Sequence, residues 1–140
     1  MLLAKNDSVR LKTELIKLRK YNRPLLKLII DLYHWVEDKY GKDVILTMIF
    51  RTQEEQDNLY KGITNSKNIK YDEYPWKSPH QFWHAIDIRS RVYNEDEIEE
   101  IVRYLNNKYN ATIYYGKTAV VHEVGDYGMH FHIQYYSLII

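Results

Sequence analysis

The sequence contains no cysteine among its 140 residues. This absence excludes a disulfide framework and also a metal site made of thiolates. It fits a reducing compartment as well as an oxidising one, so cysteine usage does not locate the protein. A metal site in this chain would have to use histidine and carboxylate ligands.

Long apolar runs are absent as well. The amino terminus has a short apolar run before charged residues begin, and this run is too short for the core of a signal peptide. The apolar stretch at residues 28–30 lies between Lys27 and Asp31 and is far shorter than a membrane span. We therefore expect a soluble protein that is made in the cytoplasm without a signal peptide and has no membrane partner.

The sequence also lacks an excess of positive or negative charge. The 20 lysine and arginine residues face 19 aspartate and glutamate residues, which leaves a formal charge of +1. A nucleic-acid partner held by its phosphates is therefore not expected, and a histidine-rich metal-dependent nuclease is poorly supported. With 45% hydrophobic residues, the chain 1–140 can bury one continuous core, so we expect a single domain and a monomer.

The first 43 residues are predicted to be helical. Residues 8–20 follow a loose helical pattern, and Pro24 is placed to open a second helix that Gly41 closes. In this second helix the apolar residues recur every three or four positions: Leu25, Leu28, Ile29, Leu32, Trp35 and Val36. We expect it to back the core.

A buried strand is predicted over residues 44–50, which are rich in β-branched and apolar side chains. Thr52 and Glu55 then have capping-box spacing for a short helix. Arg51 lies where the strand ends and the helix begins. Rigid elements on both sides aim a side chain at such a position, which often serves function, although a solvated arginine is an equally good interpretation.

Polar residues without a helical or strand period fill positions 62–77. A loop of this length inside a small domain either binds something or moves. Its aromatic residues, Tyr71, Tyr74 and Trp76, favour the rim of a substrate-binding cleft, because exposed rings are unfavourable unless they pack or bind.

The second half of the chain combines strands with one helix. Residues 85–89 predict a strand with Ile86 and Ile88 on one face and Asp87 on the other. Residues 94–109 predict an amphipathic helix with a capping box at its start. Further strands are predicted in a β-meander over 111–115, 119–124 and 130–138. Together these elements predict an α+β fold, a small antiparallel sheet with helices packed on one side.

Four residues have the spacing of a metal site. His80 and Asp87 are seven positions apart, and His130 and His132, two apart in a strand, project from the same face. A catalytic zinc site needs three protein ligands and one open position for water. Histidines that only pack are the alternative, and spacing alone does not decide between the two.

The remaining histidines give weaker signals. His34 lies between two aromatic residues of the second helix and is expected to pack or to face solvent. His84 is expected to have a surface or packing role. His122 alternates with Val120 and Val124 and is either structural or a support for the site.

Three ordered segments carry a family resemblance. Residues 78–87 read SPHQFWHAID, residues 50–60 read FRTQEEQDNLY, and residues 130–132 read HFH. In this order they resemble the SxHxxGxAxD signature, the YR…Q..LY segment and the hedgehog-like HxH of the zinc D-Ala-D-Ala carboxypeptidase and L,D-endopeptidase family, the M15 peptidases, which includes phage endolysins. The resemblance covers about residues 44–138. It implies a hedgehog/DD-peptidase-like fold for this zinc peptidase-like core.

The resemblance implies a role for each matching residue. Zinc would be held by His80, Asp87 and His132, with His130 as a nearby transition-state partner. Arg51 matches the arginine that engages the substrate peptide or its carboxylate, a task suited to a planar, permanently charged group. The residues that would brace the site or face the substrate are Gln56, Ser78 and Trp83.

Two positions differ from the family pattern. Many members have the catalytic base three residues before the last histidine ligand, where this chain has Met129. Hedgehog-like members have it six residues before, so we expect Asp126 to be the base, with Glu123 in reserve. Trp83 stands where the signature usually has glycine, and its ring would either narrow the cleft or pack under it.

The resemblance predicts a Zn2+-dependent metallopeptidase that cleaves peptidoglycan stem peptides as a carboxypeptidase or an endopeptidase. A phage or prophage origin would explain a wall hydrolase without a signal peptide. The protein would then act on the cell wall after release or as a virion component. The alternative is a non-catalytic zinc-binding structural or virion module of the same fold.

Overall fold

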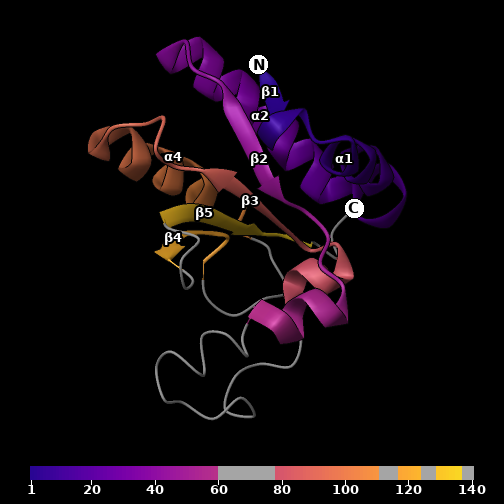
Figure 1. Cartoon of the computed structure of the whole chain (residues 1–140). Coiled ribbons are helices and arrows are strands. Elements are labelled where there is room, and N and C mark those ends of the chain that lie inside the picture. Colours follow the sequence, from indigo (N-terminus) through magenta and orange to yellow (C-terminus); the bar gives the residue numbers. More distant parts are fainter. Residues whose placement is uncertain (60–77, 111–116, 124–128, 137–140) are drawn as a thin grey trace, which may run out of the picture.

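The computed structural model describes residues 1–59, 78–110, 117–123 and 129–136. At its centre is a five-stranded sheet with the strand order β1-β2-β3-β5-β4 (Figure 1). The strands are β1 (Leu2–Ala4), β2 (Val44–Met48), β3 (Ala85–Arg89), β4 (Ala119–Glu123) and β5 (Met129–Gln134). The α+β class predicted from the sequence is thereby confirmed.

Three long helices accompany the sheet, two before β2 and one between β3 and β4. They are α1 (Val9–Tyr21), α2 (Arg23–Tyr40) and α4 (Glu95–Lys108), together with the short 3-10 turns η1 (Lys5–Asp7) and η3 (Pro79–Phe82) and a helical segment over 53–59. They lie where the sequence predicted helices, apart from η1 and η3. Among the described residues, no helix has both the length and the apolar character needed to cross a membrane.

Capping residues set the ends of the long helices. The Ser8 hydroxyl accepts a hydrogen bond from the Leu11 N–H at 3.2 Å and begins α1. Asn94 and Glu97 form a reciprocal capping box at the start of α4. Gly41 ends α2 with φ 65°, in the left-handed region that favours glycine. These ends agree with the local sequence signals.

β1 makes the sheet mixed rather than antiparallel. Leu2 and Ala4 pair in parallel with Val44 and Leu46 of β2, whereas the other neighbouring strands are antiparallel. The prediction of an antiparallel sheet is wrong at this edge. Three residues are too few to show a strand period, and β1 is recognisable only from its pairing with β2.

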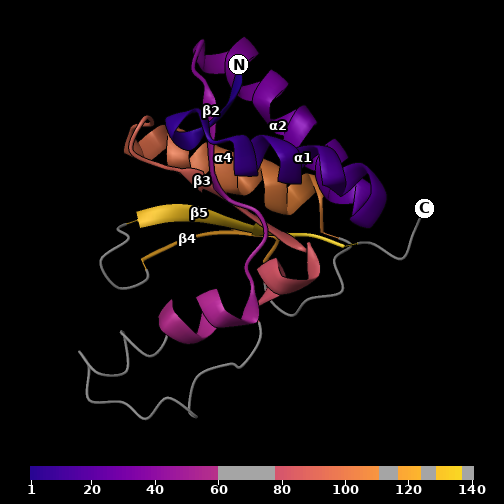
Figure 2. The same ribbon diagram turned by 45° about the vertical axis from the view of Figure 1, so that its right-hand side comes forward.

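The long helices and the smaller helical turns lie on different sides of the sheet. Figure 2 shows α1, α2 and α4 above the sheet, with η3 and the segment 53–59 below it. The core lies on the first side and includes Leu18, Leu25, Leu28, Ile29, Leu32, Ile86, Ile88, Ile101, Leu105, Phe131 and Ile133, all fully buried. Each such side chain stabilises the fold by roughly 1.5–3 kcal/mol. The other face is therefore available for the polar residues of β3 and β5.

Two strands end earlier than their patterns predicted. β2 ends at Met48 rather than at residue 50, after the pairing with β3 shifts register between Leu46 and Met48, as at a β-bulge. β5 ends at Gln134 rather than at residue 138. The predicted strand over 111–115 and the predicted cleft rim over 62–77 lie outside the described residues.

Candidate metal centre

Three side chains from three elements converge on the sheet face that points away from the long helices. Asp87 lies in the middle of β3, His132 is its register partner on β5, and His80 lies in η3. One ligand atom of each lies within 4.8 Å of the other two. These are the residues predicted as zinc ligands, and as a group they can hold a metal ion.

A capped turn positions His80. The Ser78 hydroxyl accepts a hydrogen bond from the His80 N–H at 3.2 Å, and the Ser78 N–H donates to the Gln81 side-chain oxygen at 2.8 Å. Pro79 at the start of the turn has a fixed φ that suits a helical turn. Ser78 therefore acts on the site through the backbone that carries His80.

The rings of His80 and His132 each have a hydrogen-bond acceptor on the side away from Asp87. The Nδ1 atom of His80 lies 3.0 Å from the Ile49 carbonyl oxygen, which can only accept a hydrogen bond. The Nε2 atom of His132 lies 3.1 Å from the side-chain oxygen of Gln134. Each outer nitrogen is thus the one that carries the proton in a neutral ring, which fixes the tautomer.

The inner ring nitrogens then present lone pairs to a carboxylate. His80 Nε2 lies 3.1 Å and His132 Nδ1 lies 3.0 Å from the same Asp87 oxygen, Oδ1. A neutral imidazole has one N–H, which the outer acceptor already uses. Three acceptor atoms in such close contact repel one another unless a cation, either protons on the rings or a metal ion, lies between them. This is the arrangement expected of ligands.

Asp87 supplies a buried negative charge at the centre. Burial by itself raises the pKa of the Asp87 carboxyl. With protons on the inner nitrogens, the charge of His80 and the hydrogen bonds from His132 and His80 outweigh burial and hold this pKa below its usual range. A buried carboxylate is costly unless it is paired, by several kcal/mol. The site therefore favours a positive partner at Asp87.

Two further histidines lie beside the three. His130 Nε2 is 3.5 Å from Asp87 Oδ2. The ring of His122 lies edge-on to that of His130 at 4.6 Å and stacks on that of His132 at 5.1 Å. Burial, followed by the charges of His132 and His130, lowers the pKa of His122 to about 4. The sequence left His122 between a structural and a supporting role, and its ring contacts place it against the site.

Arg51 is held next to His80 by its backbone and its side chain. Its N–H donates to the His80 carbonyl at 3.3 Å, and its guanidinium donates to the Gln56 side-chain oxygen at 2.7 Å. Gln56 is buried, with 1% of its surface exposed. Gln56 thus orients the arginine.

Trp83 packs instead of standing free in the site. Its ring lies between those of Tyr21, at 4.9 Å, and Phe50, at 4.7 Å, nearly parallel to both. Its backbone has φ 64° and ψ 27°, the left-handed conformation that glycine adopts at least cost. Of the two interpretations drawn from the sequence, the packing one describes the position of this ring.

The two acids considered as catalytic base are placed differently. Asp126 lies outside the described residues. Glu123 ends β4, and its register partner on β5 is Met129, next to the pair formed by His122 and His130. Met129 is exposed.

The other two histidines lie away from this group. His84 stacks on Tyr136 at 4.5 Å, and burial lowers its pKa. His34 is exposed and lies next to the ring of Tyr33. Both positions agree with the surface or packing roles expected from the sequence.

Comparison of the chain with protein-family models, curated proteins and solved structures gave no significant match. The fold and the side-chain cluster define an α+β protein with three residues, His80, Asp87 and His132, that can hold a metal ion.

Proposed function

We propose that the chain is a zinc metallopeptidase that cleaves peptidoglycan stem peptides. The observation that carries the proposal is the convergence of His80, His132 and Asp87 with their inner lone pairs directed at one place. Two imidazole nitrogens and one carboxylate, with no further described ligand in the group, are the donor set of a catalytic zinc.

The donor set also favours zinc over the hard cations. Magnesium and calcium prefer six or more oxygen ligands, whereas two of the three ligand atoms here are imidazole nitrogens. The Ile49 carbonyl and the Gln134 side chain supply the second contact that metal-bound histidines usually make. When bound, zinc would supply Lewis-acid activation of water and of the scissile carbonyl.

The residues around the ligands fit a peptide substrate with a carboxylate. Arg51 supplies a permanently charged fork, which Gln56 orients and which is tied to the backbone of His80. His130, in contact with the second oxygen of Asp87, is a group that can hold or give a proton beside the reacting carbonyl. We assign the base to Asp126, with Glu123 in reserve.

The restriction to cell-wall peptides comes from the resemblance to M15 peptidases. The left-handed backbone of Trp83 supports it, because this is the position at which the family signature has glycine. A protein of this kind would be made in the cytoplasm and reach the wall after release or within a virion. A non-catalytic zinc-binding virion module is the alternative.

The proposal predicts zinc at one ion per chain in the purified protein. Asp87→Ala is expected to lose the metal, and with it the rise in melting temperature that a bound ligand gives. Metal content and thermal unfolding, measured with and without a chelator, test this. Arg19→Gln is the control, because Arg19 is an exposed residue of α1. Wild-type protein without zinc, and without stabilisation by added zinc, would contradict the metal assignment.

The reaction is tested by digestion of purified cell wall followed by mass analysis of the soluble products. Wild type is expected to release stem-peptide fragments whose masses identify the bond that is cut. Asp126→Ala is expected to release these fragments at least a hundredfold more slowly than wild type, as when a general base is removed. Full zinc loading without any release would favour the non-catalytic module.

A further inference from the structure

The first turn of α1 contacts the junction between β2 and the segment 53–59. Arg10 donates to both oxygens of Glu55, at 2.9 and 2.8 Å, and to the Phe50 carbonyl at 2.9 Å. Its Nε donates to Glu14 at 2.9 Å. Such two-pronged contacts between guanidinium and carboxylate fix orientation as well as distance.

Phe50, the residue directly before Arg51, is hydrogen-bonded to α1 through both its carbonyl oxygen and its N–H. The Phe50 carbonyl accepts from Arg10, and the Phe50 N–H donates to the buried carboxylate of Glu14 at 3.3 Å. The residue directly before the predicted substrate arginine therefore has little freedom to move relative to α1.

The residues that follow Arg51 are held to α1 through the side chain of Glu55. Besides its contacts with Arg10, Glu55 accepts from the Thr52 N–H at 3.0 Å and donates its own N–H to the Thr52 hydroxyl at 3.1 Å. The next residue, Gln56, holds the guanidinium of Arg51 at 2.7 Å. Arg10 is thus connected to the side chain of Arg51 by hydrogen bonds at each end and by the backbone between Glu55 and Gln56.

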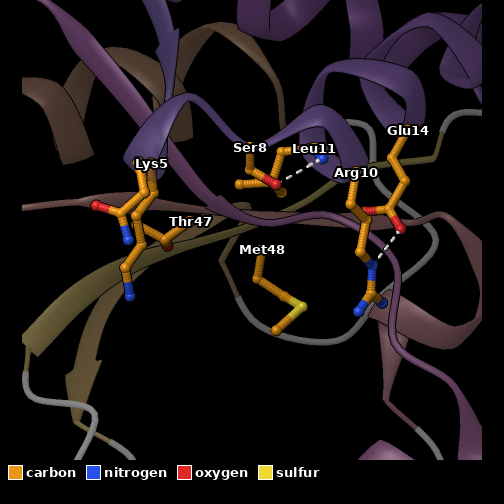
Figure 3. Close-up of a pocket in the computed structure, with 8 residues that line it drawn as sticks. Lys5, Ser8, Arg10, Leu11, Glu14, Thr47 and Met48 are labelled. Carbon is orange, nitrogen blue, oxygen red and sulfur yellow. Dashed lines mark hydrogen bonds and ion pairs between the residues drawn. The ribbon is translucent and has the colours of Figure 1, made fainter.

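A hollow lies beside this connection, although Leu11 of α1 shares the buried core with Leu46 and Ile49. Figure 3 shows Arg10 and Glu14 reaching from α1 beside a hollow of about 360 Å³ whose other wall includes Thr47 and Met48 of β2. Met48 is the register partner of Asp87. In addition to this packing, polar contacts of Arg10 and Glu14 join α1 to Phe50, just after the end of β2 and next to the candidate metal centre.

We propose that Arg10 is a positioning residue that holds Arg51 in place to bind the carboxylate of the substrate peptide. This inference rests on the proposed function in taking Arg51 as the substrate-binding residue. Arg10 lies outside the part of the chain that resembles the M15 family. It acts through Glu55 and Gln56 and does not itself touch the metal ligands.

The kinetic test compares Arg10→Gln with the matched variant Arg19→Gln on the same helix. Arg10→Gln is expected to raise KM about tenfold with kcat changed less than twofold, as when binding alone is weakened. The double variant Arg10→Gln/Arg51→Gln is expected to behave like Arg51→Gln, because both substitutions remove the same contact. Independent, multiplying effects would overturn the proposal, as would a fall in kcat at unchanged KM.

A spectroscopic test does not depend on enzymatic activity. In protein labelled with 15N-arginine, the Nε–H signal of Arg51 is identified by its loss in Arg51→Gln. Arg10→Gln and the milder Glu55→Gln are expected to shift or broaden this signal, whereas Arg19→Gln leaves it in place. An unchanged Arg51 signal in folded Glu55→Gln would overturn the positioning role. If the wild-type protein does not cleave cell wall, but the Arg51 signal shifts in Arg10→Gln and Glu55→Gln, the proposed function fails and the positioning role stands.

Discussion

Trp83 shows how one residue combines a backbone cost with a packing gain. A residue other than glycine in the left-handed region costs of order 1 kcal/mol. The two stacked partners, Tyr21 and Phe50, offset this, since each aromatic pair is worth about 0.5–1.5 kcal/mol beyond the area it buries. The ring therefore stabilises the turn that carries His80 even though its backbone does not suit it.

This balance predicts an unusual order of stabilities. Trp83→Gly and Trp83→Ala both lose the stacked ring, but Trp83→Gly is expected to be more stable than Trp83→Ala by about 1 kcal/mol, because only glycine is relaxed at φ 64°. Urea denaturation of the two variants measures the difference, with Trp83→Phe as the variant that keeps a ring. Equal stability of the glycine and alanine variants would contradict the strain.

At this scale the sequence identified much of the candidate site. Spacing and strand alternation single out His80, Asp87, His130 and His132, and the family resemblance selects His80, Asp87 and His132 as ligands. The structure brings these three together. His122 was harder to place, because its contact with His130 depends on which strand lies beside β5. The packing of Trp83 also could not be predicted, since its ring partners are distant in the sequence.

Asn22, between α1 and α2, joins these helices to the site elements. It is buried, its Nδ2 donates to the carbonyls of Trp83 at 2.9 Å and Tyr135 at 2.8 Å, and its Oδ1 accepts from the Leu25 N–H at 3.2 Å. One amide thus caps α2 and ties together the segments after η3 and after β5.

We expect Asn22→Ala to be strongly destabilising. It removes a cap and takes the donor away from two partly buried carbonyls, so a loss of about 2–4 kcal/mol is expected. Ser8→Ala, which removes only the cap of α1, is expected to cost about 1 kcal/mol. The free energies of unfolding from chemical denaturation test this, and similar losses in the two variants would argue against it.

The elements themselves were predicted where a period is long enough to recognise. The apolar spacing of α2 and α4 and their capping residues set their positions. β1 was missed because Leu2–Ala4 has no period of its own, and it forms a strand only by pairing with β2, some 40 residues later. The parallel edge is therefore a tertiary effect.

On the scale of the whole molecule, acid is expected to weaken the attachment of α1. The hydrogen bonds from Arg10, opposed by partial burial and aided by Thr52, lower the pKa of Glu55 to about 2. Because this pKa is lower in the folded state, the stabilisation is complete above the usual glutamate pKa of about 4.3 and is lost as the pH falls toward 2.

The loss is measured as the change in stability between pH 6 and pH 2.5. Wild type is expected to lose more stability over this interval than Arg10→Gln, in which only the hydrogen bonds with Thr52 still lower the pKa of Glu55. Asp87 and Asp31, which also have lowered pKa values, are present in both proteins, so they cancel in the comparison. Equal losses in the two proteins would show that Arg10 does not hold Glu55.

The contacts that join α1 and α2 to the rest of the chain were beyond sequence reasoning. Arg10 and Glu55 are 45 residues apart, and Asn22 and Tyr135 are 113 apart. Neither pair follows a local pattern, because polar contacts between distant elements depend on packing that is set only after the core has formed.

The position of Asn22 has a consequence for engineering. The segment 44–138, which alone resembles a peptidase, looks like a portable module that could be fused to other binding domains. Cutting the chain at residue 43 would remove β1 from the sheet edge, Arg10 from the β2 end, and the Asn22 amide from two partly buried carbonyls. Chimeras that keep the chain from residue 1 should therefore express as folded protein, whereas those that begin at residue 44 should not.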